Sequence, residues 1–277
     1  MSTRWRTQVR HLFLCVFPVV FLGFSGLGIA SSDCLFHLGG MSCLVFDIET
    51  SALPKEQLDE GRLEYLFRPA EKMLDEAAKA QRREEIDMQF NLWPFTAQCV
   101  CICLMNADTG RGKVLFISDD FEEASDGPVE YVACMDESDL LDQFWKLSTK
   151  YDKICTFNGR SFDVPFLYLR SAVLNVPISR KDWLGYRFQV EPHCDLAEQF
   201  TFYNVSGWTG AARRFNLDFY CKAFGIESPK AEGVTGMDVN DLMAEGRYRE
   251  IAEYCVRDVV ATTRLYEIWR ERLAGIR

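Results

Sequence analysis

Positive charge is scarce in this sequence. Among 277 residues, 31 lysines and arginines face 41 aspartates and glutamates, which gives a net charge of −10. Proteins that coat nucleic acid without regard to its sequence are normally basic, so the balance argues against that class but not against an enzyme that grips a few phosphates through metal ions. The shortage of basic residues is uneven along the chain. Residues 51–150 carry 11 basic and 21 acidic side chains, whereas residues 151–230 carry 10 basic and 8 acidic side chains. The second stretch is therefore the better face for a polyanion.

Histidines and paired cysteines are also few. The chain has 3 histidines, and its 11 cysteines include no C-x-x-C pair, so neither a zinc-finger site nor a disulfide framework is indicated. Cys99, Cys101 and Cys103 recur at a spacing of two, which predicts that all three lie on one face of a strand as small apolar core residues. An odd number of unpaired cysteines is typical of a reducing compartment, and we expect a cytoplasmic protein.

Long hydrophobic runs are confined to the first forty residues. Three arginines precede an uncharged run over residues 12–30, which is the layout of a signal peptide or of a single membrane anchor. A cleaved signal, a retained anchor and an upstream start that the cell does not use all fit this pattern. We favour the unused start, because Met41 stands just before the first expected strand and the unpaired cysteines suit a reducing compartment. Residues 1–40 then form a hydrophobic leader, and membrane contact is expected only if that leader is retained.

The remaining residues, 41–277, are predicted to form one α/β domain. Residues 54–92 are rich in charged helix formers and poor in apolar residues, which indicates an exposed insertion with one helix near 70–80. Elsewhere, short apolar runs bounded by turn signals predict strands, and apolar residues at helical spacing predict helices. Strands are expected at 44–50, 98–105, 114–118 and 153–157, and helices near 140–147, 163–174 and 251–266. This order favours a mixed sheet with a hairpin after the first strand.

Two carboxylates stand at the end of the first expected strand. Side chains alternate along a strand, so Asp47 and Glu49 point to the same side of the sheet. Carboxylates so close together resist ionisation unless a positive charge lies between them, and a divalent cation is the usual solution. The alternative is a strand that simply ends in solvated acids.

Two further segments place polar residues close to the ends or faces of elements. Asn158-Gly159 marks a turn after the fourth strand, and Asp163 follows it near the start of the next helix. Towards the C-terminus, Tyr254 and Asp258 are four residues apart and share one face of a helix, about 6 Å from each other. Each segment has a plain structural alternative, because an acid at a helix start suits the helix dipole and a tyrosine–aspartate pair can be a surface hydrogen bond.

Together these segments resemble a known enzyme family. Asp47-Ile48-Glu49-Thr50, the segment 158–163 and Tyr254-x-x-x-Asp258 are similar in order and spacing to the three exonuclease motifs of the DEDD superfamily, in its tyrosine-containing branch (DEDDy). Two more segments, Trp93-Pro94-Phe95 and His193-Cys194-Asp195-Leu196, look most like the predicted 3′-5′ exonucleases related to the proofreading domain of family-B DNA polymerases.

The resemblance covers about residues 42–270 and implies both a fold and an activity. The implied fold is α/β and ribonuclease-H-like, with a mixed five-stranded sheet flanked by helices. The implied activity is the stepwise removal of nucleotides from a 3′ end, with dependence on Mg²⁺ or Mn²⁺.

The resemblance also implies a role for each matching residue. Two divalent ions, Mg²⁺ or Mn²⁺, would be held by four carboxylates, with Asp47 bridging both ions. Glu49 and Asp258 would complete the shell of one ion, and Asp163 would hold the other. The phenol of Tyr254 would orient the attacking water rather than act as a base, because an unperturbed tyrosine has a pKa of about 10. The expected catalytic residues are therefore Asp47, Glu49, Asp163, Tyr254 and Asp258.

Three residues of the turn segment are expected to touch the substrate, namely Asn158, Arg160 and Phe162. Asn158 is an equally good turn residue, and core packing is the more ordinary role for Phe162. A base stacked on an aromatic ring is worth about 1–3 kcal/mol in proteins that bind single strands. His193 and Asp195 lie beside the expected site, and neither is assigned a catalytic role.

The expected function is metal-dependent 3′-5′ exonuclease action on single-stranded or frayed nucleic acid, with DNA favoured over RNA as the partner. An exoribonuclease is the nearest alternative, since readout of the 2′-hydroxyl is not visible in a sequence. A catalytically silent nucleic-acid-binding domain is the other alternative, and the presence of all four carboxylates and the tyrosine counts against it. No oligomeric state is predicted.

Overall fold

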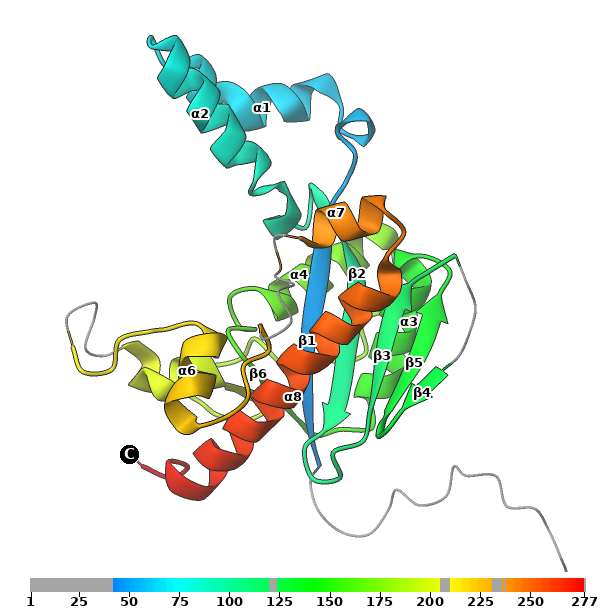
Figure 1. The fold of residues 1–277 in the computed structure, drawn as a ribbon, viewed down its shortest axis with the longest axis vertical. Coiled ribbons are helices and arrows are strands. Elements are labelled where there is room, and N and C mark those ends of the chain that lie inside the picture. The colour runs from blue at the N-terminus through cyan, green and yellow to red at the C-terminus, as the bar shows by residue number, and fades with distance from the viewer. Residues whose placement is uncertain (1–41, 120–123, 205–209, 231–235, 237, 277) are drawn as a thin grey trace, which may run out of the picture. The chain divides into compact units, whose positions relative to one another are not determined.

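The strand that carries Asp47 and Glu49 lies inside a seven-stranded sheet (Figure 1). The computed structural model describes residues 42–276 except 120–123, 205–209, 231–235 and 237. The strand order is β4-β5-β3-β2-β1-β6-β7. The strands are β1 (Cys43–Ala52), β2 (Ala97–Asn106), β3 (Gly112–Ile117), β4 (Ala124–Asp126), β5 (Val129–Cys134), β6 (Lys153–Thr156) and β7 (His193–Asp195).

Strand directions in the sheet are mixed. β1 pairs antiparallel with β2 and parallel with β6, and β2 with β3 forms the hairpin expected after the first strand. The predicted α/β class and mixed sheet are confirmed, but the predicted count of five strands is wrong. β4 and β7 have 3 residues each, which is too short for a period of two to be visible in the sequence.

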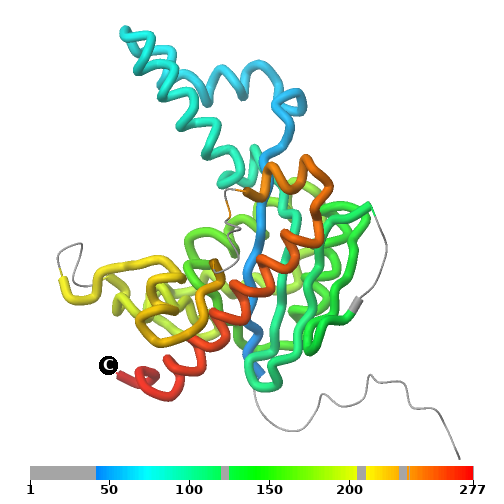
Figure 2. Tube along the Cα trace, in the orientation of Figure 1, coloured from blue at the N-terminus to red at the C-terminus, as the bar shows by residue number. Residues whose placement is uncertain are grey.

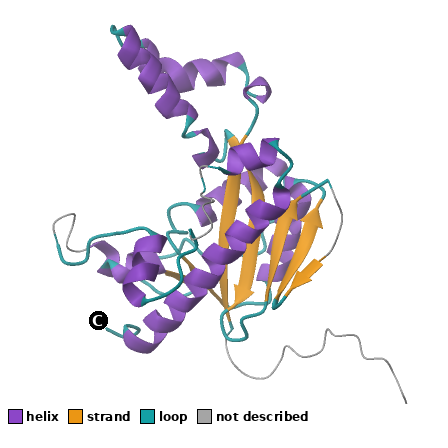
Figure 3. Cartoon of the chain, in the orientation of Figure 1, coloured by secondary structure: helices purple, strands orange, loops and turns teal. Residues whose placement is uncertain are grey.

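Helices cover both faces of the sheet (Figures 1 and 3). α3 (Glu137–Ser148) and α4 (Asp163–Leu174) pack on one face, and α8 (Tyr248–Arg272) crosses the other. The three long predicted helices therefore exist, each within a few residues of its expected bounds. Shorter helices join the α8 side, namely α5 (Leu196–Phe200), α6 (Leu217–Phe224) and α7 (Val239–Ala244).

β1 divides its side chains between these two layers. Leu44, Phe46 and Ile48 lie in the core beneath α3 and α4, whereas Val45 belongs to the core beneath α8. Asp47 and Glu49 follow Val45 at intervals of two residues, so their side chains lie on the same face of the sheet and project towards α8. The sheet thus presents both carboxylates to the helix that carries Tyr254 and Asp258.

A β-bulge interrupts β2 opposite the end of this carboxylate pair. Glu49 pairs with Cys101 but Thr50 pairs with Cys99, so Val100 is an extra residue on β2. A bulge shifts the alternation of side chains by one residue. The prediction that three cysteines share one face is therefore wrong, because Cys99 lies beneath α3 and α4 whereas Cys101 and Cys103 lie beneath α8.

A buried ion pair holds this bulge. Glu137, at the start of α3, accepts the backbone N–H of Cys99 at 2.7 Å. The same carboxylate binds Arg170 of α4 at 2.8 and 2.5 Å, and each of the two side chains is 7% exposed. Arg170 also donates to the carbonyl oxygen of Pro94 at 3.0 Å. The pair therefore joins the irregular part of β2 to both helices of that face.

The charged insertion between β1 and β2 contains the helices α1 (Glu60–Glu71) and α2 (Glu76–Asp87), whose path can be followed in Figure 2. They are flanked by short 3-10 turns at Lys55–Gln57 and Phe90–Leu92. The single helix predicted near 70–80 is wrong, because Asp75 caps a new helix by accepting the Ala78 N–H at 2.8 Å. A small core of Leu58, Ala70, Ile86 and Phe90 holds the pair together.

Residues Met41–Arg277 form one compact unit. The leader predicted over 1–40 lies outside the described residues. Within the part of the chain that the structure describes, no helix is both long enough and apolar enough to cross a membrane.

Candidate active site

Four carboxylates that are far apart in the sequence meet at the carboxyl-terminal half of β1. Asp47 and Glu49 come from β1 itself, Asp163 begins α4, and Asp258 lies in the first half of α8. The Asp163 carboxylate accepts the backbone N–H of Ile48 at 3.3 Å, which places it between the two β1 acids. Asp163, Asp258 and Glu49 all act electrostatically on Asp47. The structure therefore brings together the four carboxylates that the sequence predicts.

Burial raises the pKa values of all four acids, and repulsion between carboxylates adds to the effect at Asp47 and Glu49. The pKa values of Asp47 and Glu49 lie well above the ordinary range, first because of burial and then because of the neighbouring carboxylates. Burial likewise raises the pKa of Asp163 to about 7 and that of Asp258 to about 6. None of the four forms an ion pair with another described residue. A cluster of oxygen donors that forms no ion pair within the described part of the chain fits a hard divalent cation such as Mg²⁺ or Mn²⁺.

Tyr254 adds a hydroxyl to this cluster. Its side chain is 6% exposed, and its O–H donates to Asp258, which lowers the pKa of that carboxyl. Burial and then the charge of Glu49 raise the pKa of the phenol well above its usual range. Because the phenol stays protonated at any working pH, Tyr254 is suited to donate a hydrogen bond and unsuited to act as a base.

Cys255 is a member of the cluster that sequence reasoning missed. Its thiol approaches the backbone oxygen of Asp47 at 3.5 Å. The ligand atoms of Asp47, Glu49 and Cys255 all lie within 4.8 Å of one another. A signal did exist in the sequence, since Cys255 precedes Asp258 by three residues and helical neighbours at that spacing share a face.

The turn that leads to Asp163 is held by two buried residues of β7. The Asp195 carboxylate accepts the backbone N–H groups of Asn158 at 2.9 Å and of Arg160 at 3.0 Å. Its first oxygen also accepts the N–H of Ala197 at 3.0 Å and so caps α5. Asp195 therefore positions the turn that delivers Asp163, a role that the sequence did not reveal.

His193 supports the same turn from below. Its Nδ1–H donates to the carbonyl oxygen of Trp183 at 3.1 Å, and its Nε2 accepts from the Thr156 hydroxyl at 2.8 Å. Burial and the nearby Arg160 lower the pKa of this imidazole to about 3, so it remains neutral. The absence of a side chain at Gly159 is required, because a Cβ there would stand 2.4 Å from the Thr156 oxygen.

The three residues predicted to touch substrate already have partners within the fold. The Arg160 guanidinium donates to the carbonyl oxygens of Gly185, Gln189 and His193 at 3.2–3.4 Å. Asn158 adopts a φ of 71° and its side-chain oxygen accepts from Ser161 and Arg214. Phe162 packs on Phe166 with ring centroids 5.7 Å apart. Their substrate contacts remain predictions.

Comparison with known proteins identifies the family to which this chain belongs. Residues 94–273 match the family described as predicted 3′-5′ exonucleases related to the exonuclease domain of PolB, and this is more than half of the chain. The chain belongs to that family. The matched range contains Asp163, Tyr254 and Asp258, whereas the two carboxylates of β1 precede it.

Two curated relatives of this exonuclease-family chain are archaeal polymerases. DNA polymerase 1 of Saccharolobus solfataricus is 28% identical over 179 residues, which is 60% of this chain and 19% of that protein. DNA polymerase 1 of Sulfolobus acidocaldarius is 28% identical over 138 residues, which is 47% of this chain and 15% of that protein. The chain thus spans less than a fifth of either relative.

A solved polymerase structure contains a domain with the same fold as this chain. The family B DNA polymerase from the hyperthermophilic archaeon Pyrobaculum calidifontis superposes with a TM-score of 0.51 and 19% identity. The superposition covers 84% of this chain and 25% of that chain. The mixed sheet with flanking helices is therefore a ribonuclease-H-like arrangement shared with that polymerase.

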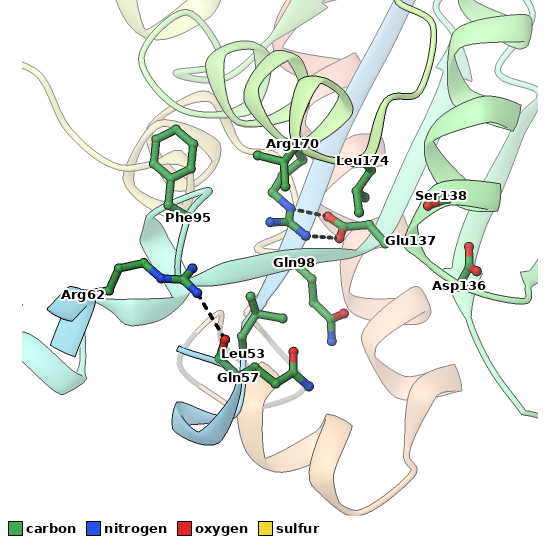
Figure 4. A pocket seen from close by; sticks show the side chains of 11 residues that line it. Leu53, Gln57, Arg62, Phe95, Gln98, Asp136, Glu137, Ser138, Arg170 and Leu174 are labelled. Atoms are coloured by element: carbon green, nitrogen blue, oxygen red, sulfur yellow. Dashed lines mark hydrogen bonds and ion pairs between the residues drawn. The ribbon is translucent and has the colours of Figure 1, made fainter. Parts of the chain in front are cut away.

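A separate cavity of about 590 Å³ lies beside the buried Glu137–Arg170 pair (Figure 4). Leu53, Phe95 and other residues from the insertion and from α4 line it. None of the predicted catalytic or substrate-binding residues is among its lining residues. This cavity is therefore distinct from the carboxylate cluster.

Proposed function

We propose that the protein is a metal-dependent 3′-5′ exonuclease that hydrolyses phosphodiester bonds from the 3′ end of single-stranded or frayed DNA. The observation that carries the proposal is the convergence of four carboxylates, two of them buried and two half-buried, none of which forms an ion pair with a described residue. Membership of a family of predicted 3′-5′ exonucleases supports both the reaction class and the direction. The similarity to archaeal polymerases supports DNA as the substrate.

In this proposal Asp47, Glu49, Asp163 and Asp258 hold two divalent ions, Mg²⁺ or Mn²⁺. Such ions, when bound, activate a water molecule and stabilise the leaving oxygen of a phosphodiester. The chain supplies the positions of the donors. β1 fixes Asp47 and Glu49 through its pairing with β2 and β6, while the Ile48 N–H and the turn clamped by Asp195 fix Asp163.

Tyr254 orients the attacking water in the same proposal. Its hydroxyl is anchored by Asp258 one helical turn later, and its raised pKa keeps the proton on the oxygen. A neutral donor held in place can align the water without competing for the cations. Positive charge near the site comes from Lys230 and Arg257, which both lower the pKa of Asp258 and suit the approach of a phosphate.

Digestion of end-labelled oligonucleotides tests the proposal. Single-stranded DNA and RNA of one sequence, labelled at either the 3′ or the 5′ end, are incubated with the protein and Mg²⁺ or Mn²⁺. We expect a 3′ label to leave at once as a mononucleotide and a 5′ label to persist on a shortening ladder, with DNA degraded faster than RNA.

The control is the Asp163→Asn variant, which keeps the shape of the side chain and removes its charge. Preferential degradation of RNA would assign an exoribonuclease instead. Binding of oligonucleotides without degradation under either cation would assign a catalytically silent binding domain and reject the proposed activity.

A further inference from the structure

A thiol stands among the oxygen donors of the carboxylate cluster. Cys255 lies on α8 and is fully buried, with its sulfur directed at the strand that carries Asp47. One ligand atom each from Asp47, Glu49 and Cys255 can be chosen so that all three lie within 4.8 Å of one another. β1 and α8 thus supply a mixed set of two carboxylates and one sulfur donor.

The chemistry of this set differs from that of the four carboxylates. Mg²⁺ binds oxygen ligands, whereas zinc and cadmium also accept sulfur. Ligand atoms in a tetrahedral zinc site lie about 3.5 Å apart, because the bonds are about 2.0–2.3 Å long. The three donors, which lie within 4.8 Å of one another, would have to approach by about 1 Å to share such a shell.

A second thiol lies behind the first. Cys101 hydrogen-bonds to Cys255 and is the residue that pairs with Glu49 across the sheet. Cys101 faces α8 by the regular alternation of β2 from Cys103, and the β-bulge at Val100 turns only the next cysteine, Cys99, to the other face. A hydrogen-bonding neighbour of this kind orients a metal ligand and tunes its affinity.

We infer that Asp47, Glu49 and Cys255 form a binding site for a thiophilic divalent cation, zinc or cadmium, within the carboxylate cluster. The inference rests on the proposed function, since the ion shares two carboxylates with the Mg²⁺ or Mn²⁺ of the nuclease. Zinc and magnesium therefore compete for the site. Binding of zinc leaves Cys255 as a thiolate and releases its proton to solvent.

Cadmium absorption tests the site directly. The full chain is titrated with Cd²⁺ in the presence of Mg²⁺, and the ultraviolet charge-transfer band of a cadmium-bound thiolate is recorded. Wild type is compared with Cys255→Ser and with Cys134→Ser, a control in which an equally buried thiol of β5 in the other core is replaced. We expect the absorbance of the band in Cys255→Ser to fall by the contribution of one cadmium-bound thiolate. The band of Cys134→Ser should be as strong as that of wild type.

Zinc affinity provides the second readout. Zinc should bind Cys255→Ser at least about tenfold more weakly than wild type, while Mg²⁺ affinity stays within about twofold. An unchanged band or unchanged zinc affinity in Cys255→Ser overturns the inference. Should that variant fail to fold, Asp47→Asn decides the matter, because the wild-type band must weaken when a carboxylate of the same shell is lost and an unchanged band overturns the site.

The two proposals fail in distinguishable ways. A protein that degrades DNA with Mg²⁺ and shows no band attributable to Cys255 refutes only the thiophilic site. A protein that shows the band and degrades no oligonucleotide refutes only the nuclease.

Discussion

Two groups of carboxylates in this molecule have opposite surroundings, and each group contains a buried glutamate. Glu137 is 6% exposed and meets the guanidinium of Arg170 and the N–H of Cys99. Glu49 is 7% exposed, yet it meets other carboxylates, and burial with their charge raises its pKa. A buried acid is expensive unless it is paired. An acid whose partner belongs to the fold is structural, whereas a cluster without one is available to bind a cation.

The change with the largest expected effect removes one acid, Asp258, from the carboxylate cluster. Asp258→Ala should lower the rate of nucleotide release by at least about 10⁴-fold, because metal-assisted stabilisation of the transition state is worth several kcal/mol. The variant should also need more Mg²⁺ for its residual activity. The matched control is Asp142→Ala, an aspartate on α3 that pairs with Lys146 at the surface. Wild-type turnover in Asp258→Ala would remove this residue from the site.

A second change leaves the acids intact and removes only the hydroxyl beside them. Tyr254→Phe should lower turnover by about 10²–10⁴-fold, since a positioned hydrogen bond to the reacting water is lost. Metal affinity and oligonucleotide affinity should stay close to wild type. Tyr266→Phe, a change to another buried tyrosine of α8, serves as the control. Equal turnover in the Tyr254 and Tyr266 variants would mean that the Tyr254 hydroxyl is only structural.

The third test breaks the buried ion pair between Glu137 and Arg170. Glu137→Ala leaves the buried Arg170 guanidinium without its carboxylate and the Cys99 N–H without its acceptor, so the free energy of unfolding should fall by about 3–5 kcal/mol. Urea denaturation measures this loss, and turnover per folded molecule should change little. Glu130→Ala is the control, because its ion pair with Lys113 is largely exposed and worth at most about 1 kcal/mol. Similar losses in both variants would contradict the contrast between the two groups.

The smallest expected effect concerns the stability of the metal-free protein. A carboxyl whose pKa is raised on folding holds its proton longer in the folded state, so stability falls as pH rises from about 4 through the raised pKa. With Asp163 at about 7 and Asp258 at about 6, the loss should accumulate between about pH 4 and 7. Asp47→Asn relieves part of this repulsion and should leave the protein as stable as wild type or slightly more stable at pH 8.

Thermal melts in chelator at pH 5 and pH 8 check this sign. Added Mg²⁺ should raise the melting temperature of wild type more than that of Asp47→Asn, because the ion binds only the folded site. Melting that becomes easier towards acid pH would show that the carboxylates are paired rather than crowded.

Much of the site was visible in the sequence because its spacings are local. A strand repeats every two residues and a helix every 3.6, so the common direction of Asp47 and Glu49 follows from the strand alone. The same reasoning places Tyr254 beside Asp258 on one helix. The resemblance to exonuclease motifs then predicted that these segments meet, and the structure brings their carboxylates together.

What the sequence missed depends on contacts between distant elements. The bulge that separates Cys99 from Cys101 is a matter of register between two strands, and no single-strand period reports it. Whether a guanidinium faces substrate or a carbonyl depends on the loop that packs beside it, as Arg160 shows. Local periodicity therefore determined which acids could share a site. Only the tertiary structure decided that Arg170 would neutralise Glu137. It also decided that Asp47 and Glu49, beside Cys255, would form no ion pair with any lysine or arginine in the described part of the chain. The reason is that such partners are set by how elements far apart in the chain pack together.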